Sequence, residues 1–373
     1  MRKKLLFIIG TRPELIKMFP IINYLKTINY NDYRIVSTGQ HKDLLEPYWN
    51  VFNLNPDYKL DIIKEGQNLT QLTSRAIIAL DELINDKIEN FKPDVILAQG
   101  DTTTVMAASM VAFYHKIEFG HVEAGLRSFD MHHPFPEEYN RRIASLSTKY
   151  HFAPTNISKE NLLNENINEK NIFTVGNSVI DTLHYFINSN QIDKHTYINS
   201  KLRGLDEKNV LITCHRRENH DYLENLIEAI DELSEEYSDL NFIWPVHPNP
   251  NVKNKVLNSS LKYKGNVFIT EPLEYLDLIK VIATSEKIIS DSGGIQEEAP
   301  TFKKAVLILR ETTERPEAVD NGLSILVGMN KNNILDAFKN FKPNFSSSNT
   351  NPYGDGNTSK RIIDILFDDQ LNI

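Results

Sequence analysis

Residues 4–14 read Lys-Leu-Leu-Phe-Ile-Ile-Gly-Thr-Arg-Pro-Glu, and this stretch sets the fold class. Its apolar half, residues 4–9, predicts a buried strand. A glycine and Thr11 follow at once, and a pattern of helical period begins at Glu14. A buried strand that leads directly into a helix is the first half of a βα unit, and such units build parallel sheets. The opening residues therefore predict an α/β protein.

The same alternation continues along the chain in two series. In the first, the expected strands are 4–9, 33–37, 94–99, 117–121, 150–153 and 172–175, with helices at 14–25, 72–88 and 103–114. In the second, the expected strands are 209–213, 241–245, 267–270, 287–290 and 305–309, with helices at 222–237, 274–284 and from about 294. Two such series predict two Rossmann-like domains, each a doubly wound parallel sheet.

The boundary between these domains is expected in a polar, poorly periodic stretch. Residues 188–203 have this character, so we expect a first domain at 1–180 and a second at 181–357. Residues 345–357 are rich in Ser, Asn, Gly and Pro, which is typical of a loop. An amphipathic helix at about 358–373 follows, and we expect it to pack back onto the first domain.

Composition narrows the classes of partner. The net charge of −9 argues against a nucleic acid or an anionic membrane surface. The single cysteine, Cys214, excludes an intramolecular disulfide and a multi-cysteine metal site, so we expect no metal. The lack of disulfides is typical of a reducing compartment, and we expect the protein to be cytoplasmic. The apolar run at 5–9 is too short for a signal peptide and ends in charged residues, and no stretch is long enough to cross a bilayer.

Polar residues and glycines gather where the expected strands end. Open parallel sheets bind their ligands at the carboxyl ends of the strands. The segments that follow those ends are 10–14, 100–104, 123–127, 214–219, 291–298 and 312–317. We therefore expect the site to be built from these segments.

One of these segments has the features of a phosphate-binding turn. Ser292, Gly293 and Gly294 precede a predicted helix, and glycines allow a phosphate to approach the backbone closely. A plain strand-to-helix turn is the alternative. Glu298, one turn later, favours a nucleotide because a carboxylate accepts hydrogen bonds from ribose hydroxyls. The chain lacks both a GxGxxG fingerprint and a P-loop lysine, so neither NAD nor ATP is expected and no cofactor is predicted.

Cationic side chains are concentrated in the same segments although the protein is acidic. A single cation there is most often a solvated surface charge, whereas a convergent set is typical of a pyrophosphate site. The set comprises Arg12, Lys17, Arg127, Arg141, Arg142, Arg216, Arg217 and Arg315.

Four residues are candidates for acid–base chemistry: Asp101, Glu123, Glu137 and His215. Burial at a strand end raises the pKa of a carboxyl toward the range useful for proton transfer. Each also has a structural alternative. Asp101 would cap the helix at 103, Glu123 would pair with Arg127, Glu137 would start a helix and His215 would be a core histidine. Four structural roles at four strand ends are less probable than one shared site.

At these segments the chain resembles the non-hydrolysing UDP-N-acetylglucosamine 2-epimerases. The resemblance runs through most of the chain and is specific as a set. The motifs are GTRPELIKMFP at 10–20, TGQH at 38–41, GDTTT at 100–104, HVEAGLRS at 121–128, PEEYNRR at 136–142, HFAPT at 151–155, VGNSVIDTL at 175–183, HRREN at 215–219, SDSGGIQEEAP at 290–300 and TTERPEAV at 312–319.

The resemblance implies a GT-B-like fold, with two domains facing each other across a cleft, and a homodimer. It implies reversible conversion of UDP-N-acetylglucosamine to UDP-N-acetylmannosamine, for the synthesis of cell-surface polysaccharides. Asp101, Glu123, Glu137 and His215 match the family's catalytic positions. Its UDP-binding positions match Arg12, Lys17, Ser292, Gly293, Gly294 and Glu298. We add Arg127, Arg141, Arg216, Leu278 and Arg315 to the expected substrate-binding set.

The chemistry agrees with this implication. The C2 proton of the sugar is not next to a carbonyl, so a stabilised carbanion cannot form directly. Elimination of UDP across C1 and C2 gives a 2-acetamidoglucal, and re-addition with protonation of the other face inverts C2. This route needs carboxylates near both faces of C2 and cations on the leaving pyrophosphate.

The chain also departs from the family pattern. Leu278 stands where an aromatic residue usually contacts the uracil, and Gly66 stands where bacterial members often have an arginine of a regulatory substrate site. Three alternatives stay open beside the main hypothesis: an epimerase of a modified UDP-sugar (a diacetamido-uronic acid or a 6-deoxy sugar), a hydrolysing epimerase and a nucleotide-sugar sensor. A GT-B glycosyltransferase is a further rival, but it would not require carboxylates at three strand ends.

Overall fold

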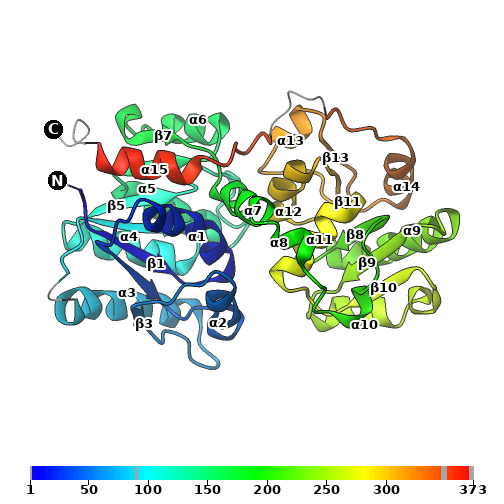
Figure 1. Ribbon diagram of the computed structural model, residues 1–373, viewed down its shortest axis with the longest axis horizontal. Coiled ribbons are helices and arrows are strands. Elements are labelled where there is room, and N and C mark those ends of the chain that lie inside the picture. Colours follow the sequence, from blue (N-terminus) through cyan, green and yellow to red (C-terminus); the bar gives the residue numbers. More distant parts are fainter. Residues whose placement is uncertain (1, 89–90, 346–350, 369–373) are drawn as a thin grey trace. The chain divides into compact units, whose positions relative to one another are not determined.

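The computed structural model describes residues 2–88, 91–345 and 351–368. The chain divides into two compact units (Figure 1). The first unit comprises Met1–Thr182 together with Tyr353–Ile373, and the second comprises Leu183–Pro352.

The first unit is built on a parallel sheet of seven strands in the order β3-β2-β1-β4-β5-β6-β7. The strands are β1 (Leu5–Ile9), β2 (Tyr33–Ser37), β3 (Tyr58–Lys59), β4 (Val95–Gln99), β5 (Glu118–Val122), β6 (Tyr150–Ala153) and β7 (Ile172–Thr174). The order reverses between β1 and β4, which pair directly. Such a reversal opens a crevice at the carboxyl ends of the two strands, and ligands of doubly wound sheets bind there.

The helices of this unit pack on the two faces of the sheet. They are α1 (Arg12–Thr27), α2 (Lys42–Val51), α3 (Leu69–Glu82), α4 (Thr103–Tyr114), α5 (Glu137–Ser147), α6 (Asn156–Asn164) and the first part of α7 (Ser178–Asn188). The predicted last helix is α15 (Thr358–Phe367), and it packs against α1. Asp181 fixes its start, because the carboxylate accepts hydrogen bonds from the Thr358 and Ser359 amides at 3.2 and 2.7 Å.

The second unit repeats the plan with six parallel strands in the order β10-β9-β8-β11-β12-β13. They are β8 (Asn209–Thr213), β9 (Asn241–Pro245), β10 (Val267–Thr270), β11 (Ser285–Ser290), β12 (Ala305–Ile308) and β13 (Ser324–Leu326). The helices are α8 (Gln191–Lys194), α9 (Leu223–Glu236), α10 (Pro250–Leu257), α11 (Tyr275–Thr284), α12 (Gly293–Glu298), α13 (Glu317–Asp320) and α14 (Lys331–Asn340). Here the order reverses between β8 and β11.

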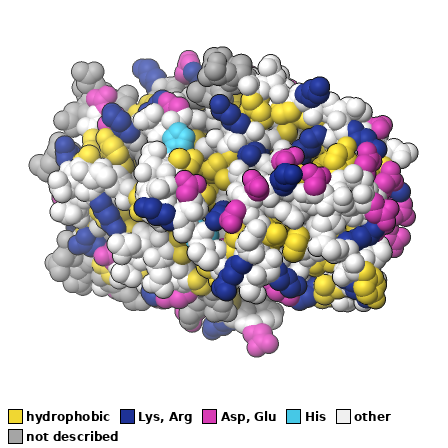
Figure 2. All heavy atoms as spheres, turned by 45° about the vertical axis from the view of Figure 1, so that its right-hand side comes forward, with side chains coloured by type: hydrophobic (Ala, Val, Ile, Leu, Met, Phe, Trp, Pro, Cys, Tyr) yellow, Lys and Arg dark blue, Asp and Glu magenta, His cyan; other side chains and the backbone are white. Residues whose placement is uncertain are grey.

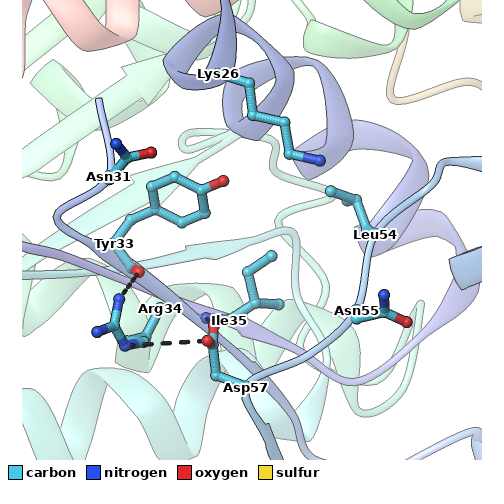
Figure 3. A pocket seen from close by; sticks show the side chains of 8 residues that line it. All are labelled: Lys26, Asn31, Tyr33, Arg34, Ile35, Leu54, Asn55 and Asp57. Carbon is cyan, nitrogen blue, oxygen red and sulfur yellow. Dashed lines mark hydrogen bonds and ion pairs between the residues drawn. The ribbon is translucent and has the colours of Figure 1, made fainter. Parts of the chain in front are cut away.

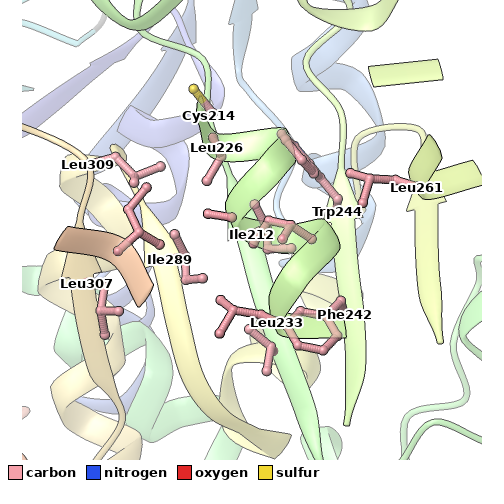
Figure 4. Close-up of a cluster of buried hydrophobic side chains, with 14 of the residues drawn as sticks. Ile212, Cys214, Leu226, Leu233, Phe242, Trp244, Leu261, Ile289, Leu307 and Leu309 are labelled. Carbon is pink, nitrogen blue, oxygen red and sulfur yellow. The ribbon is translucent and has the colours of Figure 1, made fainter. Parts of the chain in front are cut away.

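The core of the second unit shows why these strands form. Apolar side chains of β8, β9, β11 and β12 meet those of α9, with Ile212, Leu226, Leu233 and Trp244 fully buried among them (Figure 4). Burying such side chains is the main stabilisation of a domain of this size, at about 1.5–3 kcal/mol each. All eleven predicted strands are present, and the prediction of two parallel-sheet α/β domains is confirmed.

The surface is mixed in charge. On the face drawn in Figure 2, Lys and Arg side chains are interspersed with Asp and Glu side chains. Across the described ranges, no helix has the length and apolar character needed to cross a bilayer.

Candidate active site

Three loops that follow strands of the first unit contact one another at Gly10. A Cβ atom at Gly10 would lie 2.3 Å from Thr104 Oγ1 and 2.7 Å from Thr38 Oγ1, so only glycine fits. Those two hydroxyls are 3.0 Å apart, and Gln40 Oε1 accepts hydrogen bonds from the Thr104 amide at 3.1 Å and hydroxyl at 2.7 Å. The loops after β1, β2 and β4 therefore form one rigid polar surface at the strand reversal.

Glu14 lies buried beside these residues, and the sequence alone indicated no role for it. Its side chain is buried, with Oε2 accepting hydrogen bonds from the Gly10 amide at 2.5 Å and the Thr11 amide at 3.3 Å. Burial raises the pKa of Glu14 to about 7, although these hydrogen bonds act in the opposite direction. The Thr11–Glu14 spacing of a capping box was the signal available in the sequence.

Asp101 follows β4 and is held from α5. Its Oδ2 lies 2.5 Å from Arg141 Nη2, and Asn140 Nδ2 donates to its carbonyl at 2.9 Å. The alternative role for Asp101 as a helix cap is wrong, because Thr102 is the N-cap of α4 and its hydroxyl accepts from the Val105 amide at 3.4 Å. The carboxylate is therefore available for a role outside the helix.

Glu123 follows β5 and forms an ion pair with Lys17 of α1. Asn177 Nδ2 donates to the same carboxylate oxygen at 3.1 Å. Both partners of the pair are about 90% buried, at 10% exposure for the Lys17 side chain and 8% for Glu123. Two predicted site residues, 106 positions apart, thus meet beside the strand reversal.

Arg127 is not positioned as a pyrophosphate ligand, and the structural alternative in which it would pair with Glu123 is wrong. Its guanidinium binds both oxygens of Glu165 at 2.8 and 2.7 Å and donates to Ser145 Oγ at 3.0 Å, with the side chain wholly buried. Because these donors bind groups within the protein, the ion pair between Arg127 and Glu165 is structural.

Glu137 is the first residue of α5, as its structural alternative predicted, and is half-buried. Its neighbour Glu138 is fully buried and accepts from Arg141 Nη1 at 3.3 Å, Arg142 Nε at 3.0 Å and the Ser128 amide at 3.0 Å. Glu138 thereby fixes Arg141, which in turn contacts Asp101. Arg12 begins α1 and donates to Tyr48 Oη at 3.2 Å.

A buried histidine supports the Asp101 loop. His121 of β5 contacts the Gly100 carbonyl through Nε2 at 2.7 Å, and His151 lies opposite it on β6. Burial lowers the pKa of His121 to about 4 and that of His151 to about 3, so both rings are neutral at pH 7. A neutral His121 donates its Nε2–H to the Gly100 carbonyl. This contact positions Asp101, which follows Gly100.

In the second unit the predicted His215 lies beside Asp291. Its Nδ1 is 2.9 Å from Asp291 Oδ1, and its side chain is 42% exposed while that of Asp291 is fully buried. The alternative role of His215 as a core histidine is therefore wrong. Asp291 belongs to the strand-end segment 291–298, but the sequence alone indicated no role for it.

The predicted phosphate-binding turn lies at the end of β11. Ser292 is the N-cap of α12, and a Cβ atom at Gly293 would lie 2.6 Å from Arg315 Nη1. Glycine therefore lets the Arg315 side chain pass over the turn. A Cβ atom at Gly294 would meet only Ser292 Oγ, at 3.9 Å.

Three arginines of this unit converge on Glu314. Its carboxylate lies 3.1 Å from Arg216 Nη2, 2.5 Å from Arg310 Nη1 and 2.6 Å from Arg315 Nη1. Burial would raise the pKa of Glu314, but the three guanidinium groups outweigh it and hold the pKa far below its usual range. The cluster brings Arg216 and Arg315 together, as predicted, and adds Arg310.

The predicted nucleoside contacts lie near α11. Tyr275 Oη donates to Glu298 Oε1 at 3.1 Å, and both residues are buried. Leu278, on the same helix, is partly buried against the core cluster that includes Ile295 and Leu273. The residues of this unit's predicted set thus lie at the ends of β8, β11 and β12 and on α11 and α12.

A hollow of about 210 Å³ lies elsewhere, at the amino end of β2 (Figure 3). Arg34 crosses it, donating to the Tyr33 carbonyl at 2.8 Å and lying 3.9 Å from Asp57. It contains no predicted site residue. Within the described ranges, no group of three or more His, Cys, Asp or Glu side chains is arranged to hold a metal ion.

Known proteins share this architecture. Residues 24–367 match the family model described as UDP-N-acetylglucosamine 2-epimerase. The UDP-N-acetylglucosamine 2-epimerase of Neisseria meningitidis serogroup A is 43% identical, over 98% of this chain and 99% of that protein.

Solved structures agree. The crystal structure of UDP-GlcNAc 2-epimerase from Neisseria meningitidis bound to UDP-GlcNAc has a TM-score of 0.87 at 42% identity, covering 97% of this chain and 99% of that one. The Methanocaldococcus jannaschii UDP-GlcNAc 2-epimerase in complex with UDP-GlcNAc and UDP has a TM-score of 0.81 at 37% identity, with the same coverage. The predicted GT-B-like fold is confirmed by these matches together with the two parallel sheets. By sequence and by fold, the chain belongs to the UDP-N-acetylglucosamine 2-epimerase family.

Proposed function

We propose that this protein interconverts UDP-N-acetylglucosamine and UDP-N-acetylmannosamine by eliminating UDP and adding it back. The observation that carries the proposal is the pair of carboxylates just after the adjacent strands β4 and β5. Asp101 is held by Arg141 at 2.5 Å and Glu123 is held by Lys17. Two positioned carboxylates at one strand reversal suit a reaction that removes a proton from C2 and returns one.

In this scheme one of Asp101, Glu123 and Glu137 accepts the C2 proton, and the electrons of the C–H bond form the C1–C2 double bond. The C1–O bond breaks, and its electrons go to the β-phosphate of UDP. Re-addition reverses these steps, with a second of the three residues protonating the opposite face of C2. Arg12, Lys17 and His215 have the role of stabilising the departing diphosphate.

The second unit holds the nucleotide in this proposal. Glycine at position 293 allows close approach to the backbone, and Arg216 and Arg315 are pre-assembled by Glu314. Glu298 accepts hydrogen bonds from the ribose, and Leu278 contacts the uracil. Arg127 has no part, because its side chain is wholly buried and Glu165 and Ser145 use its donors, whereas the side chains of Arg216 and Arg315 are 22% and 13% exposed.

The proposal extends to assembly and setting. Phe113, Tyr114 and Leu146 are 65%, 66% and 80% exposed on α4 and α5, which pack side by side. A cluster of large apolar side chains on a surface marks an interface, and a second copy of this chain is the proposed partner. The domains are proposed at 1–180 and 181–357, and the enzyme at work in the cytoplasm on precursors of cell-surface polysaccharides.

Proton NMR of the purified protein with UDP-N-acetylglucosamine in D2O tests the reaction. We expect UDP-N-acetylmannosamine to appear and deuterium to enter at C2 without any added cofactor. Release of free N-acetylmannosamine would identify a hydrolysing enzyme instead. An unchanged spectrum with this sugar, but turnover of a 6-deoxy or diacetamido analogue, would move the proposal to a modified UDP-sugar.

The role of Asp101 has its own test. The Asp101→Asn variant should lose turnover by about 10²–10⁴-fold and still bind UDP, because Asp101 is not among the proposed UDP-binding residues. Asp86→Asn, a change of the same kind at an exposed residue far from the strand ends, is the control. Near-normal turnover of Asp101→Asn would contradict the acid–base scheme.

A further inference from the structure

Asp291 is a buried carboxylate whose immediate surroundings are hydrogen-bond donors. It follows β11 directly, opposite the residue that follows the neighbouring strand β8. Oδ2 accepts from the His215 amide at 2.9 Å, the Arg216 amide at 2.9 Å and Asn219 Nδ2 at 3.0 Å. Oδ1 faces His215 Nδ1 at 2.9 Å.

This environment fixes which nitrogen of His215 carries a proton. Burial would raise the pKa of Asp291, but the hydrogen bonds from His215 and the two backbone amides outweigh it and lower the pKa to about 2. An ionised carboxylate only accepts hydrogen bonds. His215 Nδ1 must therefore be the donor in this contact, and Nε2 is the ring nitrogen that points away from Asp291.

We propose that Asp291 is a positioning residue for the reaction: it holds His215 by the Nδ1–H and presents Nε2 to the nucleotide sugar. This inference rests on the proposed function, and it adds a residue to which no role was assigned. In the elimination step, the Asp291 carboxylate stabilises the positive charge of a doubly protonated His215 ring, whose Nε2–H donates a hydrogen bond to the phosphate oxygen that receives the C1–O electrons. An amide at position 291 cannot stabilise that charge. Asp291 does not touch the substrate and acts only through His215.

The Asp291→Asn variant should reverse the tautomer. Three donors surround Oδ2, so the amide oxygen of the variant will occupy that side. Its NH₂ group then faces Nδ1, which must become an acceptor, and the ring proton moves to Nε2. The same exchange in a catalytic Asp–His pair of another enzyme class lowers kcat by about 10⁴ with the geometry intact.

The same unit supplies a matched control. Asp277 is also buried, and it accepts from His195 Nε2 at 2.6 Å, the Ile198 amide at 3.0 Å and the Asn199 amide at 2.9 Å. Asp277→Asn therefore disturbs an equivalent Asp–His pair with two backbone amides. A purely structural effect of losing such a carboxylate would appear in both variants.

The experiment records long-range ¹H–¹⁵N spectra of ¹⁵N-histidine-labelled protein, with the His215 signals identified from a His215→Gln sample. Wild type should show a protonated Nδ1, and Asp291→Asn should show a proton on Nε2 and an unprotonated Nδ1. In the epimerisation assay, kcat of Asp291→Asn should fall about 10²–10⁴-fold with KM changed far less. Asp277→Asn should keep the wild-type His215 signals and kcat within about threefold.

Two results would overturn the inference: an Nε2–H tautomer of His215 in the wild type, or a switched tautomer without loss of kcat. The wild-type spectrum decides even if Asp291→Asn does not fold. If the wild type has the Nδ1–H form but shows no epimerase activity with any UDP-sugar, the proposed function fails, and with it the catalytic role of Asp291.

Discussion

Glu14 in the first unit and Asp291 in the second make an instructive comparison. Both are buried carboxyls beside the strand at which their sheet reverses its order, yet the pKa of Glu14 is raised to about 7 and that of Asp291 is lowered to about 2. Glu14 accepts two backbone hydrogen bonds, whereas Asp291 accepts from two amides, a side-chain amide and a histidine ring. Burial alone therefore does not decide the charge of a carboxyl, because the number and charge of its donors do.

The largest expected effect is the difference in stability between the two sites when each carboxyl is removed. Asp291→Leu leaves several buried donors and a histidine without their partner, which should cost about 3–5 kcal/mol. Glu14→Met, measured at pH 6 where the carboxyl is largely neutral, should cost about 1–2 kcal/mol. Calorimetric Tm values check this, and equal losses for the two variants would contradict the comparison.

The next effect is a pH dependence that belongs to Glu14. Its pKa rises from 4.5 to about 7 on folding, so its bound proton stabilises the fold fully below pH 4.5, and this contribution is lost as the pH rises through 7. Glu14→Gln removes that equilibrium. Relative to Glu14→Gln, the wild type should therefore lose about 3 kcal/mol between pH 4.5 and 8. Parallel Tm curves of the two proteins across this range would show that Glu14 is not perturbed.

A smaller effect is expected from the contact that fastens the loops above Glu14. Gly10→Ala places a methyl group 2.3 Å from Thr104 Oγ1 and 2.7 Å from Thr38 Oγ1, which should cost about 1–3 kcal/mol and lower kcat by displacing Asp101. Gly265→Ala, where an added Cβ atom meets nothing within 4 Å, is the control and should leave both Tm and kcat unchanged. If Gly10→Ala left both Tm and kcat unchanged, the three loops would move independently.

The smallest expected effect separates structural from ligand-binding arginines. Arg127→Lys should lower Tm, because lysine cannot bind both oxygens of Glu165, but should leave the Kd for UDP unchanged within about twofold. Arg315→Lys, beside Gly293, should weaken UDP binding about tenfold. Titration calorimetry of both variants checks this. If Arg127→Lys and Arg315→Lys lost a similar amount of affinity for UDP, Arg127 would belong to the nucleotide site.

Much of the fold could be predicted from the sequence, because a strand buried on both faces must be a continuous apolar run. Two strands and several helices were not predicted, among them α6, α7, α10 and α14. For three of the missed elements the physical reason is plain. β3 and β13 have two and three residues, too few to form such a run, and α2 contains Pro47 within a partly polar segment. The last helix was predicted correctly at 358–367, whereas residue 368 is extended, and the rest of the expected range, 369–373, lies outside the described residues.

The candidate site was predicted as a set of segments, but not as a set of contacts. Pairing Glu123 with Arg127 followed helical spacing, whereas the chain there is a loop and Arg127 reaches Glu165, 38 residues away. Asp101 and Thr102 are both residue types that cap helices. The structure places the N-cap of α4 at Thr102, one position after Asp101. Glu14 and Asp291 were visible in their motifs, but nothing in a motif states how deeply a side chain is buried.

The sequence by itself determined the two βα series, the glycines and charged residues at the strand ends, and the family to which these motifs point. These are local properties, since a run, a period or a motif is complete within about twenty residues. Only the tertiary structure decided which charges meet, as Lys17 and Glu123 do across 106 residues and Arg216 and Glu314 across 98. It also decided which carboxyls keep a proton, because electrostatic energies depend on distance, burial and donors contributed by other strands.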